Sequence, residues 1–177
     1  GISFKLSRKA LDAVKVSSVQ VDVRNYTKYA ICETVHQFLG GDWISLKGYD
    51  EELVEKNCSI GEINDASVYL YWRVLGNICL GAFDKAGTII KTLDDLFEVY
   101  GNDLSKSFKY QANTYLLIES GKLEDAMIES DEGIFFEENV RSSFWHLHIY
   151  QAWIHIMMGA IKKAQKCLER ADRIMLQ

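Results

Sequence analysis

Apolar residues recur along most of this chain at the three- and four-residue spacing of an amphipathic helix. The last such segment is the clearest, because charged side chains fill the opposite helix face. Its apolar positions are Ile161, Ala164, Leu168, Ala171 and Met175, and its charged positions are Lys162, Lys163, Lys166, Glu169, Arg170 and Arg173. We expect the apolar positions to form one buried stripe.

A short motif recurs four times, at Gly41, Gly81, Gly121 and Gly159, with spacings of 40, 40 and 38 residues. Each glycine precedes a large apolar residue by two positions and Ala or Leu by five. Glycine tolerates the left-handed conformation that ends a helix, and a small residue lets two antiparallel helices approach. The paired positions are Trp43 with Leu46, Phe83 with Ala86, Leu123 with Ala126, and Ile161 with Ala164. Each motif therefore predicts a helical hairpin, and equal hairpins stack side by side.

The predicted lead helix covers about residues 3–16. The predicted helix pairs are 25–39 with 43–57, 66–80 with 84–99, 104–119 with 123–137, and 141–158 with 161–175. Loops are expected near 17–24, 58–65 and 100–103. The alternation of apolar and polar residues from Val19 to Val23 leaves a short strand as an alternative there.

Other positions repeat around the glycines. They are Trp72, Leu75 and Gly76 before Gly81; Tyr110 and Leu117 before Gly121; and Ala152 and Ala171 around Gly159. Over roughly residues 25–177 these positions resemble tetratricopeptide repeats. That family repeats every 34 residues and has a terminal proline, which this chain lacks. The resemblance is therefore to longer, divergent relatives, such as the helical arms of bacterial signalling ATPases and MalT-like transcription regulators. It implies a solenoid that binds a peptide, a protein or, in some regulators, a small inducer.

We therefore expect an all-α fold, a right-handed superhelical solenoid of about four antiparallel hairpins with 38–40-residue repeats plus the lead helix. The expected repeats are about 25–64, 65–103, 104–139 and 140–177, within a single domain 1–177. Because the chain begins at Gly1 rather than methionine, we expect it to be part of a larger protein.

Composition narrows the function classes. Of the 177 residues, 48% are hydrophobic and 25% charged, as in folded proteins with a core. The net charge of -5 argues against a nucleic-acid binder. No apolar run is long enough to predict a membrane span. The four cysteines form no CxxC pair, which favours a reducing, cytoplasmic setting.

We expect a ligand to contact the concave face, which the first helix of each hairpin would line. The candidate positions are Tyr71, Leu75, Gln111, Tyr115, Ile149 and Trp153. A core position is the alternative for each of these residues, because helices between two neighbours bury most of their surface. The acidic stretch of the third hairpin, between Glu124 and Glu138, is interpreted as a solvated face, with a docking surface for a basic partner as the alternative.

Little in the sequence indicates catalysis or metal binding. His148 and His155 share a helix face, but their seven-residue spacing is too long for one metal ion without a third ligand. Cys32 and His36 are one helical turn apart, yet a nucleophile pair also needs an orienting group. We expect no enzyme activity, cofactor or metal.

The function predicted is a protein or peptide interaction module in a signalling or regulatory protein. Alternatives are self-association through the N-terminal end and small-molecule sensing.

Overall fold

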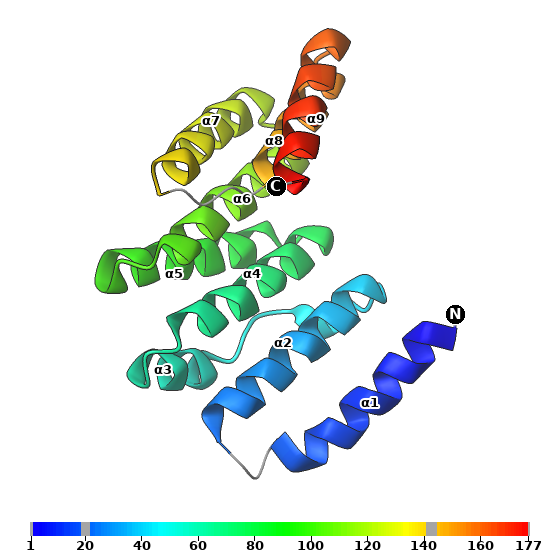
Figure 1. Cartoon of the computed structure of the whole chain (residues 1–177), viewed down its shortest axis with the longest axis vertical. Coiled ribbons are helices and arrows are strands. Elements are labelled where there is room, and N and C mark those ends of the chain that lie inside the picture. Colours follow the sequence, from blue (N-terminus) through cyan, green and yellow to red (C-terminus); the bar gives the residue numbers. More distant parts are fainter. Residues whose placement is uncertain (1, 19–21, 141–144, 177) are drawn as a thin grey trace. The chain divides into compact units, whose positions relative to one another are not determined.

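The computed structural model describes residues 2–18, 22–140 and 145–176 (Figure 1). These residues form nine α-helices and one 3-10 turn and contain no strand, which confirms the predicted all-helical class. The chain divides into two compact units, residues 1–105 and 106–177. The division falls close to the predicted end of the second repeat. Each unit is described by itself.

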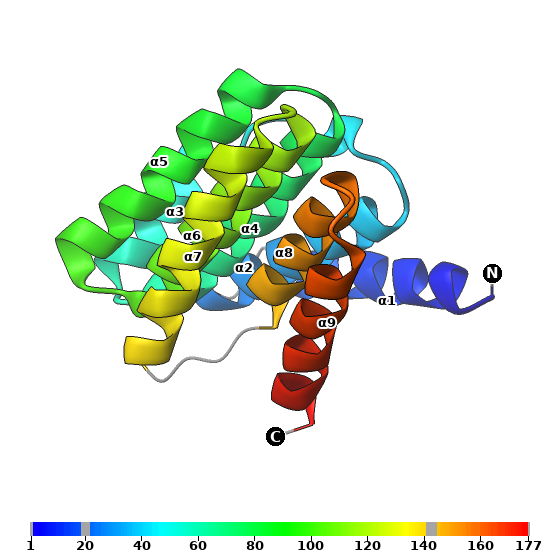
Figure 2. The same cartoon turned by 90° about the horizontal axis from the view of Figure 1, so that it is seen from above.

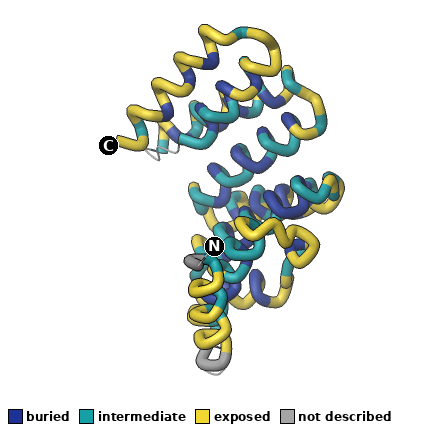
Figure 3. The backbone as a smooth tube through the Cα atoms, turned by 90° about the vertical axis from the view of Figure 1, so that its right-hand side faces the viewer, coloured by how far each residue is buried: buried dark blue, intermediate teal, exposed yellow. Residues whose placement is uncertain are grey.

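Unit 1 is built around two central helices, α2 and α4. Helix α2 packs against α1, α3 and α4, and α4 packs in turn against α5. Leu70 and Val74 of α4 are fully buried, as are Ile89 and Leu93 of α5. Figure 3 shows that buried residues, in dark blue, alternate with exposed and intermediate ones along the helices. The helices are α1 (Ile2–Ser18), α2 (Val23–Leu39), the 3-10 turn η1 (Ile44–Leu46), α3 (Glu51–Ser59), α4 (Ile63–Cys79) and α5 (Phe83–Tyr100).

Unit 2 contains most of α6 (Asp103–Glu119), with α7 (Leu123–Asn139), α8 (His146–Met157) and α9 (Ile161–Met175). Helix α8 packs against both α7 and α9, and α9 runs beside it (Figure 2). One core cluster joins α6, α7 and α8 through Ile118, Ala126 and Ile154. A second joins α8 and α9 through Ala152, Ala164 and Cys167. The small side chains let the helices of unit 2 lie close together.

The four motif glycines adopt the left-handed conformation that the repeat predicts. At Gly81 φ is 69°, and the N–H of Ala82 donates to the carbonyl of Asn77 at 2.9 Å, which closes the end of α4. Gly41, Gly121 and Gly159 have φ of 77°, 75° and 73°. Gly61 ends α3 in the same way, with φ of 81°, and Gly101 follows α5 with φ of 63°. Helices thus end at a glycine every 20 residues from Gly41 to Gly121. This 20-residue period of helix ends was not among the features predicted from the sequence.

The second helix of the first hairpin is not the continuous 43–57 segment that we predicted. The chain forms the 3-10 turn η1 and a loop, and α3 begins only at Glu51. Gly48 has φ of 77°, which interrupts the helix. The carboxylate of Asp50 then accepts a hydrogen bond from the N–H of Leu53 at 3.0 Å. An aspartate in this position starts a new helix.

The remaining boundaries agree with the prediction to within a few residues. Helix α4 begins at Ile63 rather than at residue 66, and α2 begins at Val23. The start predicted for the last hairpin, at residues 141–144, lies outside the described residues. So do residues 19–21, the centre of the alternative strand.

The stripe predicted on the last helix is only half buried. Ala164 and Ala171 face α8 and are buried, but Ile161, Leu168 and Met175 are 62%, 47% and 53% exposed. The exposed three lie on the flank that α8 does not cover, so the prediction of a single buried stripe was wrong.

Leu46 occupies the place where the other hairpins have alanine, and Gly76 makes room for it. The Leu46 side chain is fully buried. A Cβ added to Gly76 would lie 2.6 Å from the Leu46 Cβ, well inside van der Waals contact. The Nδ2 of Asn77 donates to the Leu46 carbonyl at 3.1 Å, and Arg73 Nη1 donates to the Ser45 carbonyl at 3.0 Å. Together these contacts fix η1 against α4.

Substitution of Gly76 by alanine is expected to destabilise the protein by about 1–3 kcal/mol, because the added methyl group would overpack the contact with Leu46. The matched control is Gly87→Ala in α5, where an added Cβ meets no atom within 4 Å. This control should stabilise the protein by up to about 1 kcal/mol through helix propensity. Urea unfolding followed by circular dichroism measures both. Equal effects of the two substitutions would contradict the tight Leu46–Gly76 contact.

Candidate binding surfaces

Three of the predicted concave-face residues are interior residues. Tyr71 and Leu75 are 5% and 6% exposed, and Gln111 is fully buried. Helix α4 lies between α2 and α5, so its neighbours cover most of its circumference. The Nε2 of Gln111 donates to Glu137 Oε1 at 3.0 Å inside unit 2. In the structure these side chains contribute to packing and not to an accessible binding surface.

The other predicted residues lie in unit 2, where α6 and α8 bring aromatic rings together. The rings of Tyr115 and Tyr150 stack with centroids 5.7 Å apart and an interplanar angle of 8°. The Trp153 ring lies 5.9 Å from that of Tyr115, and Trp153 is 37% exposed. Ile149 is half-buried on α8. The structure therefore joins Tyr115 and Trp153 in one aromatic cluster, which extends to the surface at Trp153.

Three of the acidic residues of α7 are engaged within unit 2. Lys109 Nζ lies 2.7 Å from Glu129 Oε1, a pair that is largely buried. Gln151 Nε2 donates to Asp131 Oδ1 at 2.6 Å, and Glu137 accepts the bond from Gln111. These contacts fix the rotation of α7 about its own axis. Its other carboxylates remain on the surface.

A groove of about 780 Å³ lies between α1 and α2 in unit 1. Most of the side chains that line it are apolar, and among the described residues lining it none carries a carboxylate. They are Phe4, Ser7, Ala10, Leu11 and Val14 of α1, and Asn25, Lys28, Tyr29, Ile31, Cys32, Val35, His36 and Leu39 of α2. This surface was not predicted from the sequence, although the apolar positions of α1 span a wide arc of the helix.

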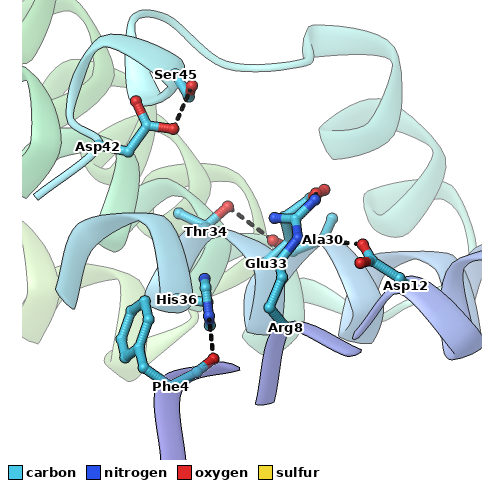
Figure 4. A network of polar contacts seen from close by, with 9 residues as sticks. All are labelled: Phe4, Arg8, Asp12, Ala30, Glu33, Thr34, His36, Asp42 and Ser45. Atoms are coloured by element: carbon cyan, nitrogen blue, oxygen red, sulfur yellow. Dashed lines mark hydrogen bonds and ion pairs between the residues drawn. The ribbon is translucent and has the colours of Figure 1, made fainter. Parts of the chain in front are cut away.

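Polar contacts hold α1 beside α2 (Figure 4). The Arg8 guanidinium lies 3.1 Å from the Asp12 carboxylate and 3.7 Å from that of Glu33, so it links the two helices. The ring of His36 packs 4.0 Å from that of Phe4, and its Nε2 lies 3.4 Å from the Phe4 carbonyl oxygen. Burial, together with the Glu33 carboxylate, raises the pKa of Tyr29 to about 12. The walls of the groove are thus fixed by specific contacts.

The helix α1, which forms one wall of the groove, has a net charge opposite in sign to that of the whole chain. Helix α1 carries four cationic side chains, Lys5, Arg8, Lys9 and Lys15, against one carboxylate, Asp12. Lys28 of α2 lines the groove itself. The chain as a whole has a net charge of -5. The groove is therefore an apolar surface with one lysine, Lys28, in its lining, and one of its walls belongs to a helix of net positive charge.

The histidines and cysteines form no metal centre. Within the described ranges, no group of three or more His, Cys, Asp or Glu side chains is placed to hold a metal ion. His148 is buried, whereas Cys32 is exposed and His36 packs on Phe4. Burial, aided by the nearby Arg170 guanidinium, lowers the pKa of His148, and burial also lowers that of His146. These histidines are best described as packing residues.

Within the described residues no helix is both long and apolar enough to cross a membrane.

In comparisons with protein families, curated proteins and solved structures, no match to this chain was found. The geometry of the chain's own surfaces is therefore the basis for the functional argument.

Acidification should destabilise the protein through His148. Its pKa is lowered in the folded state, so below the ordinary value of 6.5 the unfolded chain binds the proton more readily. Stability is therefore lost as the pH falls from about 6.5 toward the folded-state pKa. The change His148→Gln should reduce the loss between pH 7 and pH 5 in urea unfolding. An unchanged dependence on pH would contradict this role for His148.

Proposed function

We propose that this chain is a non-catalytic interaction module that binds a polypeptide in the groove between α1 and α2. The observation that supports the proposal is the groove itself, which is apolar, open to solvent and free of carboxylates among its described lining residues. The resemblance to tetratricopeptide repeats implies the same class of function. It also supports the proposal that the module belongs to a larger signalling or regulatory protein, and the cysteine pattern favours a cytoplasmic one.

The occupant that suits this groove is an amphipathic helix. At a rise of about 1.5 Å per residue, the 17 residues of α1 offer a wall about 25 Å long, enough for four to five helical turns. A helix laid in a groove presents anchors at every third or fourth position. Leu11 and Val14 from α1, with Cys32 and Val35 from α2, would contact such anchors.

The cationic side chains of α1 and α2 indicate which residues should lie beside the apolar anchors of the bound helix. Lys28 is exposed and lines the groove, and α1 carries a net positive charge, so a carboxylate beside the apolar anchors would find a cation nearby. Exposed ion pairs of this kind each contribute about 0–1 kcal/mol, so apolar burial would supply most of the affinity. The charges would act mainly on partner choice and association rate. The proposed partner is therefore an acidic amphipathic helix.

The test uses Cys32, which is exposed and lines the groove. The probe is a designed helical peptide with leucine at positions i, i+4, i+7 and i+11 and glutamate on the remaining faces. Saturating peptide should slow the iodoacetamide alkylation of Cys32 by about tenfold, because the thiol would be covered. Site-resolved mass spectrometry separates Cys32 from Cys58, Cys79 and Cys167, whose rates should not change.

The matched control is the same peptide with lysine in place of every glutamate, which should protect Cys32 much less. Equal protection by both peptides would contradict recognition by charge. No protection by either peptide would contradict the proposed function. In that case, protection of Cys32 by a small apolar compound such as an anilinonaphthalene dye would support the small-molecule alternative, since the groove volume suits such a ligand.

A further inference from the structure

The solvent-facing side of α7 carries two large apolar residues among carboxylates. Ile128 and Phe135 are 60% and 69% exposed and stand seven residues apart, so they share one helix face. Glu124, Glu132 and Glu138 are exposed beside them. We call these five residues the acidic ridge. In total α7 contains seven carboxylates and no cationic side chain.

The acidic ridge cannot turn inward to bury its apolar residues. The opposite face of α7 is fixed by the Lys109–Glu129 pair and by the bond from Gln111 to Glu137. Gly133 also lies so close to α6 and α8 that an added Cβ would be 2.7 Å from Tyr110 and from Leu147. Helix α7 therefore holds Phe135 and Ile128 in water, which is unfavourable until another surface covers them.

The acidic ridge carries carboxylates, which are absent from the described lining of the groove between α1 and α2. It offers two apolar anchors flanked by carboxylates, whereas the groove is apolar, has no carboxylate among its described lining residues, includes Lys28, and has one wall formed by the net positive helix α1. We propose that the acidic ridge of one copy of this chain docks into the α1–α2 groove of a second copy. This inference rests on the proposed function, because it names the helix that the groove receives.

Helix α9 also exposes apolar residues but is a poor occupant of the same groove. Ile161, Leu168 and Met175 are exposed on it. However, the helix carries five cations against two carboxylates, so it would meet like charge at α1. Charge therefore selects α7 rather than α9.

The two contact surfaces are different, so the proposed association is head-to-tail. Each copy that docks its acidic ridge leaves its own groove available, and assembly can continue beyond a dimer. The complex should weaken in salt, because the cations and carboxylates that meet in it lie near the surface.

The first test is sedimentation velocity of the full chain over a range of concentrations at 50 and 500 mM NaCl. The average mass should rise with concentration and fall with salt. Phe135→Glu should abolish the association, whereas the control Val99→Glu, at an equally exposed position of α5, should preserve it. Cys32→Glu, which places a carboxylate in the groove, should also abolish it. Circular dichroism confirms that each variant folds.

Mixing the two defective variants gives the decisive result. Phe135→Glu keeps an intact groove and Cys32→Glu keeps an intact acidic ridge, so the mixture should form a one-to-one dimer and nothing larger. A wild-type chain that stays monomeric while the designed acidic peptide still protects Cys32 would overturn this inference and leave the proposed function standing. Association that survives either variant would also overturn it, because another surface would then be responsible.

Discussion

The left-handed turn at the end of the helices is the constraint on which the rest of this structure depends. At Gly41, Gly61, Gly81, Gly121 and Gly159 the backbone reverses at a positive φ, and carbonyls of the preceding helix are capped by the following N–H groups. A residue with a Cβ would pay roughly 1–2 kcal/mol at each such turn. The regular spacing of these glycines sets where each helix ends, and it makes the helices from α4 to α7, of 17 or 18 residues each, nearly equal in length.

The two units fill the space between their helices differently. The core of unit 1 is built from large aliphatic residues such as Leu70, Ile89 and Leu93. In unit 2 alanines are common in the core. The fully or nearly buried residues there also include Gln111, which donates to Glu137, and Gln151, which donates to Ser130. Buried polar pairs require particular partners, so they fix helix rotation more than they add stability. That fixed rotation keeps the acidic ridge of α7 exposed.

The sequence predicted the hairpins best where glycine and a small residue act together. The second and third hairpins lie close to their predicted places because Gly81 with Ala86, and Gly121 with Ala126, each determine a turn and a close helix approach. The first hairpin departed from the prediction because Asp50 caps a new helix, a local signal stronger than the periodicity.

The binding surfaces were harder to predict than the helices. Tyr71 and Leu75 have the residue types of a binding face, but which side of a helix is covered depends on its neighbours, and one position along a helix turns a side chain by about 100°. The α1–α2 groove went unrecognised because one of its walls, α1, comes from the lead helix, which lies outside the predicted repeats. The sequence feature that could have indicated the groove is the wide arc of apolar positions on α1, whose other positions include four cationic side chains.

The central claim is that this chain receives a polypeptide between α1 and α2, and hydrogen exchange of the full chain tests it most directly. Exchange is measured by mass spectrometry with and without the designed acidic peptide. The account predicts that amides of α1 and α2 become slower to exchange, while those of α8 and α9 are unchanged. Slowing confined to α8 and α9, around Tyr150 and Trp153, with α1 and α2 unaffected, would contradict it.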